Sequence, residues 1–551
     1  MRGHPERNPL GFALALALLA APLILFLVNL LAVTLRSEPA AILNELWSAY
    51  PAVLTSLAAG AATMLAVVAI AWLLASFAVR AAFVWDRFAT ALLCFTLALA
   101  TIPFLLGPTS FGFLWSSSFL KLAMSVGGGD DRGPATVILV NVLANILRYA
   151  PLLTWLLLAT AMDVDARRVW SERTAGFGSA DFIRDEATPI WALICLVVAA
   201  FAFQDASGDY IITYLALRPS EATGTELASH ALQRIFVGAT ISGSARDAFD
   251  LVLVASAAIA ALAVITFILF SLPILRLRRL SSSYHRRPAP QLRRQLVPPR
   301  FSAIFVATAA VTILLPLLAP LFFRQYSGAA LVQSLGRSVA LSLAAALVSW
   351  AAAATIVFSA RSGAALADGS AQRRLKLLAL VALMVGFVPV IGFASAVQST
   401  AFTYVGTGSG SAYAAWFAAQ CLRLIPILAI FMMPAALQIE DRQLQYLRPL
   451  GVSFLFRFKA LFLSPYRTTH FAFMLVAWNW IVNEGVISTV FQADIPSFSE
   501  LMLRATSGRS AAYSVAASLV AAEALLFGLL CSLWARQIYS SWRYRHAQNF
   551  A

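Results

Sequence analysis

The residues best placed to do chemistry are charged side chains within long apolar stretches. Arg148 and Arg423 each stand three residues before a proline, and the carboxylates Asp209 and Glu484 follow further along the chain. A charge in an apolar environment is costly, so such a side chain tends to line a cavity or meet a partner. These groups could bind a charged solute. The alternative is that each arginine bonds to backbone carbonyls freed by its proline and that the acids are solvated in loops.

Further polar residues surround the two carboxylates in sequence. Gln204 and Asp205 precede Asp209, and Asn479 and Asn483 precede Glu484. A pair of carboxylates with neutral polar neighbours favours a cation. The five histidines and four cysteines show no metal-ligand or redox spacing, and no nucleophile elbow is present. We therefore expect no catalytic residues, no metal and no cofactor.

The elements that carry these residues are predicted to be membrane-spanning helices. Hydrophobic residues make up 60% of the 551 positions and charged residues only 12%, with a mean hydropathy of +0.80. Apolar runs of roughly 20 residues span a bilayer as helices, because helices satisfy their own backbone. We predict an all-α polytopic helical bundle with twelve spans, at 11–35, 52–78, 89–108, 135–160, 190–206, 249–275, 302–323, 337–360, 376–398, 412–436, 468–483 and 512–535.

The charge distribution predicts the orientation. The net charge is +15, and with both termini cytoplasmic most of the Lys and Arg residues fall in cytoplasmic segments. This positive-inside pattern indicates a multi-pass protein of a bacterial inner membrane with both termini in the cytoplasm. Membrane lipid is then the surrounding partner, and the basic residues do not indicate nucleic-acid binding.

The chain also looks duplicated. An offset of 275 pairs Arg148 with Arg423 and Asp209 with Glu484, and it also pairs charged residues and a glycine in a loop between them. The segment 276–300 carries eight arginines and no acid, which is typical of a cytoplasmic linker. We predict a first six-span half at 1–275, a basic linker at 276–300 and a second six-span half at 301–551, as a parallel repeat.

In each half, the loop before the fifth span has the same layout. It has an acidic start, a glycine that allows a sharp turn, a Phe-containing stretch and a proline that opens the next span. Gly precedes Pro by 13 residues in the first copy and by 14 in the second. The residues are Asp165, Arg167, Arg173, Gly176, Phe182 and Pro189, and Glu440, Arg442, Arg448, Gly451, Phe458 and Pro465.

This layout resembles the EAA loop of binding-protein-dependent ABC importer permeases. Trp170 and Gln445 stand where that family has a glutamate. The chain is similar in topology to the fused twelve-span permeases of iron(III), thiamine and polyamine-type importers. The resemblance implies that the two loops couple to two copies of a P-loop ATPase subunit. It also implies that a periplasmic binding protein delivers a small molecule or ion.

The chain itself has no nucleotide-binding loop. A P-loop needs a Gly-Lys pair, and the three lysines, Lys121, Lys376 and Lys459, follow Leu120, Leu375 and Phe458. We therefore expect a permease subunit that is not itself an enzyme. The alternative is a secondary transporter of the major-facilitator type, although the Asp86-Arg87 pair between the second and third spans lacks the glycines of that signature. A membrane-integral enzyme is the third alternative.

Overall fold

The computed structural model is entirely helical within the residues that it describes. These are residues 9–35, 47, 49–84, 86–115, 134–162, 174, 176, 178–183, 187–208, 227–242, 245–282, 299–314, 328–362, 370–404, 409–437, 439, 441–447, 452–491 and 510–547. The prediction of an all-α polytopic membrane protein is confirmed at this level.

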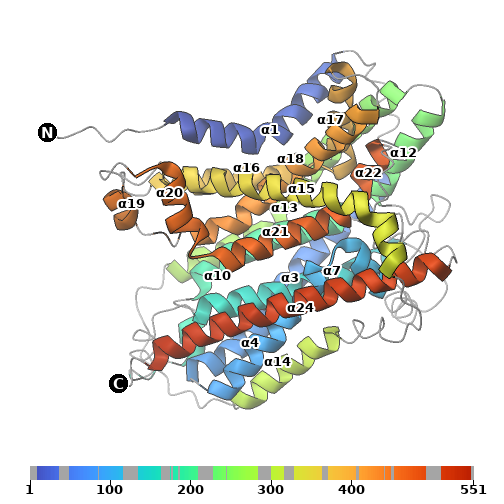
Figure 1. Cartoon of the computed structure of the whole chain (residues 1–551). Coiled ribbons are helices and arrows are strands. Elements are labelled where there is room, and N and C mark those ends of the chain that lie inside the picture. The colour runs from blue at the N-terminus through green and yellow to red at the C-terminus, as the bar shows by residue number, and fades with distance from the viewer. Residues whose placement is uncertain are drawn as a thin grey trace. The chain divides into compact units, whose positions relative to one another are not determined.

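The long helices follow the apolar stretches of the sequence (Figure 1). The helices are α1 (Pro9–Thr34), α3 (Tyr50–Val84), α4 (Arg87–Leu99), α5 (Ile102–Leu105), α7 (Pro134–Met162), α9 (Ser179–Phe182), α10 (Thr188–Gly208), α12 (Ala228–Ser242), α13 (Ala245–Ser282), α14 (Pro299–Leu314), α15 (Gly328–Ser362), α16 (Ser370–Gly386), α17 (Val390–Tyr404), α18 (Ser409–Leu437), α19 (Asp441–Leu447), α20 (Phe454–Phe458), α21 (Arg467–Val482), α22 (Val486–Phe491) and α24 (Ser510–Ala547), with a π-helical turn at Lys459–Leu463.

Nine helices in the described part of the chain are long and apolar enough to cross a membrane. A tenth span is bent: Arg373–Gly386 and Val390–Ala401 meet at 91°. The break falls between Gly386 and Pro389, where a proline cannot continue the preceding helix. Two shorter apolar helices, Arg300–Thr312 and Thr469–Val482, overlap the seventh and eleventh predicted spans. Every predicted span therefore overlaps an apolar helix, and the bend at the ninth was not predicted.

The chain forms two compact units, each built from separate stretches of sequence. Unit 1 comprises Met1–Tyr50, Ala228–Val264 and Ala329–Leu501, and unit 2 comprises Pro51–Leu227, Ile265–Gly328 and Met502–Ala551. In unit 1, α1 packs against α16, α17 and α18. In unit 2, α14 and α24 both pack against α4, and α10 packs against α7. The predicted linker lies largely outside the described residues, and the division at 276–300 stays a prediction.

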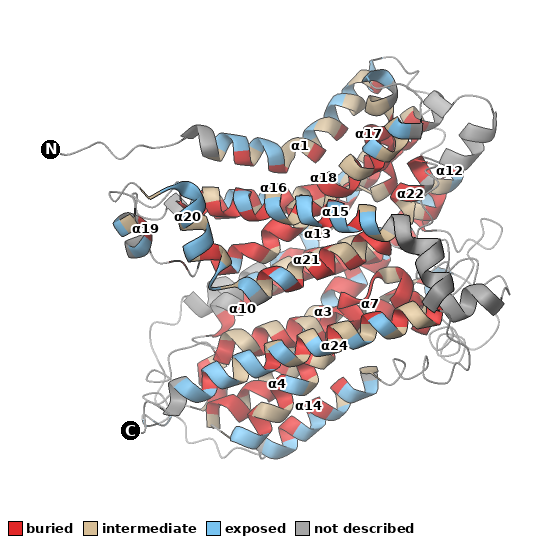
Figure 2. Cartoon of the chain, in the orientation of Figure 1, coloured by how far each residue is buried: buried red, intermediate tan, exposed pale blue. Residues whose placement is uncertain are grey.

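Burial differs between the helices in a way that fits a lipid environment. Figure 2 shows long buried stretches on α7, whereas α1 carries many exposed residues. Many of the exposed residues of α1 and α24 are large and apolar, among them Leu14 and Leu31 on α1 and Leu525 and Leu529 on α24. In water such surfaces would favour association, whereas hydrocarbon solvates them. The outer faces of these two helices are therefore suited to lipid contact.

A glycine lets two helices of unit 1 approach closely. A Cβ atom added at Gly392 of α17 would lie 2.2 Å from the Cβ atom of Ser256 on α13. Small residues at helix contacts allow backbones to meet at van der Waals distance, which is how membrane helices gain packing energy. Gly410, near the start of α18, has nothing within 4 Å of its Cβ position.

We predict that Gly392→Ala lowers the free energy of unfolding by about 1–3 kcal/mol, because it overpacks the α13–α17 contact. Gly410→Ala is the matched control and should leave stability unchanged or slightly raised. Thermal unfolding in detergent measures both, and adding Ser256→Gly to Gly392→Ala should restore part of the loss. Equal stability of the two single variants would show that the contact is not close.

Asp86 stabilises the start of α4. Its Oδ1 accepts a hydrogen bond from the Ala89 backbone N–H at 3.0 Å, and its Oδ2 accepts one from the Arg300 guanidinium at 2.8 Å. Burial raises the pKa of Asp86, but the bonds from Ala89 and Arg300 outweigh it and hold the pKa below its ordinary value. The residue therefore caps α4 and ties it to α14.

A carboxyl with a lowered folded-state pKa contributes stability above its unfolded pKa and loses that contribution as pH falls through its folded pKa. We predict that Asp86→Asn, which keeps a capping oxygen, costs at most about 1 kcal/mol at pH 7. The difference from the parent chain should be smaller at pH 3 than at pH 7, because the unfolded state gains its proton first as the pH falls. Asp86→Ala also loses the cap and should stay less stable at both pH values, as unfolding in detergent at the two pH values would show. A pH-independent effect of Asp86→Asn would contradict the ion pair.

Candidate functional site

A polar stripe runs along one face of the apolar helix α7. Asn141, Asn145 and Arg148 are spaced four and three residues apart, which places them on the same side of a helix. All three are buried, Arg148 with a side chain only 3% exposed. Arg148 is also the central residue of α7, so its charge lies midway along a helix that is long enough to span a bilayer.

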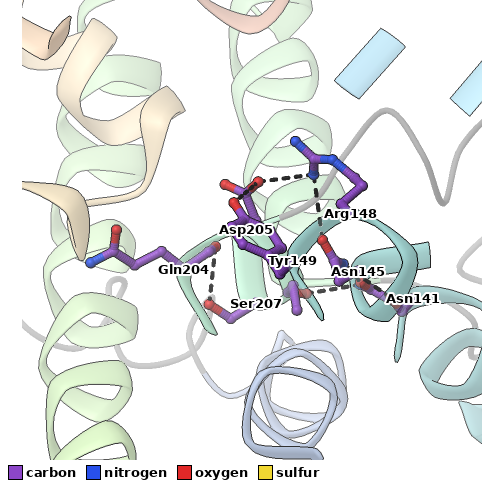
Figure 3. A network of polar contacts seen from close by, with 8 residues as sticks. Asn141, Asn145, Arg148, Tyr149, Gln204, Asp205 and Ser207 are labelled. Atoms are coloured by element: carbon purple, nitrogen blue, oxygen red, sulfur yellow. Dashed lines mark hydrogen bonds and ion pairs between the residues drawn. The ribbon is translucent and has the colours of Figure 1, made fainter. Parts of the chain in front are cut away.

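Arg148 forms an ion pair with Asp205 of α10 (Figure 3). The distance from Arg148 Nη1 to Asp205 Oδ2 is 2.9 Å, and the Tyr149 hydroxyl donates to the same oxygen at 2.6 Å. The Asp205 side chain is 38% exposed, whereas that of Arg148 is 3% exposed. The arginine is therefore enclosed, and the carboxylate is the accessible partner.

The two asparagines connect this pair to the backbone of α10. Asn145 Nδ2 donates to Asn141 Oδ1 at 2.6 Å, and Asn141 Nδ2 donates to the Ala206 carbonyl at 2.8 Å. Arg148 Nη1 also donates to Asn145 Oδ1 at 3.4 Å. These bonds orient both helices around the ion pair (Figure 3).

Aromatic rings lie beside the arginine. The guanidinium carbon of Arg148 is 5.8 Å from the ring centroid of Phe111 and 5.4 Å from that of Tyr149. Phe111 stacks on Trp115 with centroids 4.6 Å apart, and Phe104 meets Tyr149 at 5.3 Å. Aromatic faces attract cations, so the rings favour the charged guanidinium as well as covering it.

A second polar cluster lies in unit 1, where Arg423 is the central residue of α18. Glu484 follows α21, and its carboxylate accepts hydrogen bonds from the backbone N–H groups of Val486 at 3.1 Å and Ile487 at 2.8 Å. Arg423 acts on Glu484 electrostatically, and Gln420 faces it. Here backbone amides at the start of α22 hold the carboxylate.

The structure brings most of the predicted polar residues into these two clusters. Asn483 Nδ2 donates to the Asn479 carbonyl at 3.0 Å, and both side chains are buried beside the second cluster. Asp209 lies outside the described residues, and the carboxylate that pairs with Arg148 is Asp205. Tyr149, Asn141 and Asn145 were missed, although the i, i+4, i+7 spacing of Asn141, Asn145 and Arg148 could have indicated them.

The residues predicted for the two loops are less fully described. Asp165, Arg167, Arg173, Glu440, Arg448 and Gly451 lie outside the described residues. Gly176 has a φ of 83°, which favours glycine. Phe182 is buried against Phe83. Pro189 lies in the first turn of α10, Pro465 precedes α21, Phe458 lies at the end of α20 and Arg442 lies in α19.

No protein-family model and no curated protein matches this chain. Among solved structures, the chain matches a MOP superfamily transporter from Pyrococcus furiosus, which is described as having a binding pocket of reversed polarity. The sequence identity is 13%, and the match covers 98% of this chain and 97% of that chain. The TM-score is 0.15, so the similarity establishes neither a common fold nor a common substrate.

The comparison corrects the family assignment made from the sequence. No family model and no curated protein supports an ABC importer permease, and the solved structure that matches is a MOP superfamily transporter. The predicted permease identity and function are therefore withdrawn. The predicted ATPase and binding-protein partners were implied by that resemblance and are withdrawn with it. The motif itself explains why the sequence suggested the wrong family. A glycine with positive φ and a proline in a first helical turn are general devices for ending and starting helices, so their spacing is not specific to one family.

We predict that the two partners of the ion pair differ in what their removal costs. Asp205→Ala leaves the enclosed Arg148 without its carboxylate and should cost about 3–5 kcal/mol of unfolding free energy. Arg148→Met leaves the accessible Asp205 with its Tyr149 hydrogen bond and should cost about 1–3 kcal/mol. Unfolding in mixed micelles tests the order, and the double variant should cost less than the sum of the two. The reverse order would show that Asp205 is the more dependent partner.

Proposed function

We propose that this chain is a secondary transporter that moves a small, positively charged solute across a bacterial inner membrane. The observation that carries the proposal is the Arg148–Asp205 ion pair between two apolar helices, each long enough to cross a membrane. A charged side chain near the centre of a bilayer costs roughly 2.5–3.5 kcal/mol on insertion scales. Such residues mark solute or ion pathways more often than they serve stability.

The unequal exposure of the pair supports a cation as the solute. The carboxylate of Asp205 is the accessible member, and Arg148 lies behind it among aromatic rings. A cation or a proton that reaches Asp205 competes with Arg148 for the carboxylate. Breaking and remaking one ion pair then links solute binding to the contact between α7 and α10.

The driving force is proposed to be an ion gradient. No lysine of the sequence follows a glycine, so the chain contains no P-loop of its own. Asp205 is a carboxylate within α10, and carboxylates within spans serve proton-driven transporters as relay sites. The chain would then function without a nucleotide-hydrolysing partner.

Helix lengths support two tandem six-span halves. α3 and α15 each have 35 residues, α7 and α18 each have 29, and α13 and α24 each have 38. α7 and α18 begin 275 residues apart (409 − 134), which is the offset of the sequence repeat. The distribution of Lys and Arg supports cytoplasmic termini.

Transport by the purified chain in proteoliposomes tests the function. With a panel of radiolabelled amines, amino acids and carboxylates, we expect a cationic member to accumulate under an imposed pH gradient without ATP. Uptake should stop when an ionophore collapses the gradient. Asp205→Asn should reduce uptake at least about tenfold, because a charge-assisted contact contributes about 1.5–3 kcal/mol.

Asp86→Asn is the control, since it removes a carboxylate at a helix start outside the site. It should leave uptake unchanged. Accumulation that requires ATP and an added nucleotide-hydrolysing chain would overturn the proposal. So would full uptake by Asp205→Asn.

A further inference from the structure

The segment 453–467 of unit 1, here called the amphipathic segment, has one anchored face and one exposed face. It contains α20, the π-helical turn Lys459–Leu463 and the turn that leads into α21. Ser453 caps its start, since Ser453 Oγ accepts a hydrogen bond from the Phe456 backbone N–H at 3.3 Å. π-helical turns occur frequently at functional sites.

A ladder of aromatic rings holds the inner face. Phe454, Phe458 and Phe462 are spaced four residues apart, and their ring centroids lie 5.4, 5.3 and 5.8 Å from that of Phe358 on α15. Phe462 and Phe358 are fully buried. These ring contacts hold the segment against α15. Figure 1 shows α20 running across the direction of α15.

The outer face is apolar and uncovered. Leu455 is 74% exposed and Phe456 58% exposed, and α20 contains no buried residue. On the neighbouring apolar helix α21, Phe471 is 53% exposed. An apolar face that continues onto a second apolar helix is suited to the boundary between acyl chains and headgroups.

Three cations lie beside this face, and none of them pairs with an acid in the part of the chain that the structure describes. Arg457, Lys459 and Arg467 form no ion pair with any described residue. The sequence contains no Asp or Glu between Arg442 and Asn483. Exposed Leu and Phe side chains beside uncompensated Lys and Arg are the combination that binds an anionic bilayer surface.

We propose that the amphipathic segment is a membrane-surface anchor that binds anionic phospholipid. Leu455 and Phe456 enter the acyl boundary, and Arg457, Lys459 and Arg467 contact lipid phosphates. This surface uses none of the residues of the Arg148–Asp205 site, and its test does not depend on transport.

Lipid retention by the full-length protein tests the charged half of the proposal. The protein is delipidated and titrated with phosphatidylglycerol or phosphatidylcholine, and bound lipid is counted by native mass spectrometry. We expect preferential binding of phosphatidylglycerol. Arg457→Gln with Lys459→Gln should weaken it roughly thirtyfold, since each cation near an anionic surface contributes about fivefold.

The matched control is Arg373→Gln with Lys376→Gln, which removes two exposed cations from α16 of the same unit. It should leave the preference intact. Equal weakening by both double variants would overturn the proposal, because it would show a diffuse charge effect. Equal binding of the two lipids by the parent chain would overturn it as well.

Insertion of the apolar face is tested in nanodiscs that contain phosphatidylglycerol. Leu455→Cys can be labelled with bimane selectively, because the four native cysteines are buried. We expect lipids that carry a doxyl group near the headgroup to quench the label more than aqueous iodide does. Stronger quenching by iodide would overturn the proposal. So would iodide protection in native membranes but not in nanodiscs, which would indicate a protein partner on this face.

Discussion

The structure depends on one constraint: a polar group within an apolar helical bundle must find its partners inside the bundle. Arg148 shows how this constraint determines the neighbouring residues. Its charge requires the carboxylate of Asp205, and this requirement fixes α10 against α7. The asparagine bonds and the aromatic rings around Arg148 follow from the same need. A single central arginine thus determines the identity of neighbouring residues on two helices.

Unit 1 meets the same constraint in another way. Glu484 is held by the backbone amides of Val486 and Ile487, which a helix start offers without any side-chain donor. Arg423 therefore acts on a carboxylate that is already hydrogen-bonded, whereas Arg148 is the principal cation of Asp205. Although the two segments are similar in sequence, a side-chain cation holds the carboxylate in one, and backbone amides hold it in the other.

The sequence predicted the helices well because apolar length is a direct physical requirement for spanning a bilayer. It placed Arg148 and Arg423 near the middle of their helices for the same reason. It did not identify Asp205 as the partner of Arg148, because pairing depends on how α7 and α10 meet. It also misassigned the family, because Gly176 and Pro189 reflect turn geometry that many proteins need. Turns and helix starts were predictable from the sequence, whereas the side chains that pair between helices were not.

The unequal exposure of Arg148 and Asp205 means that solvent reaches the carboxylate far more than the guanidinium. Arg148 is enclosed by Phe111, Tyr149 and Asn145, so its position is set by packing as well as by charge. Asp205 can exchange its partner at smaller cost, because a carboxylate that is 38% exposed can be hydrated when the pair opens. In the proposed transport cycle, an arriving cation would meet the carboxylate, and the arginine would be the competitor that restores the empty state. A pair buried equally on both sides would be a structural bond without this asymmetry.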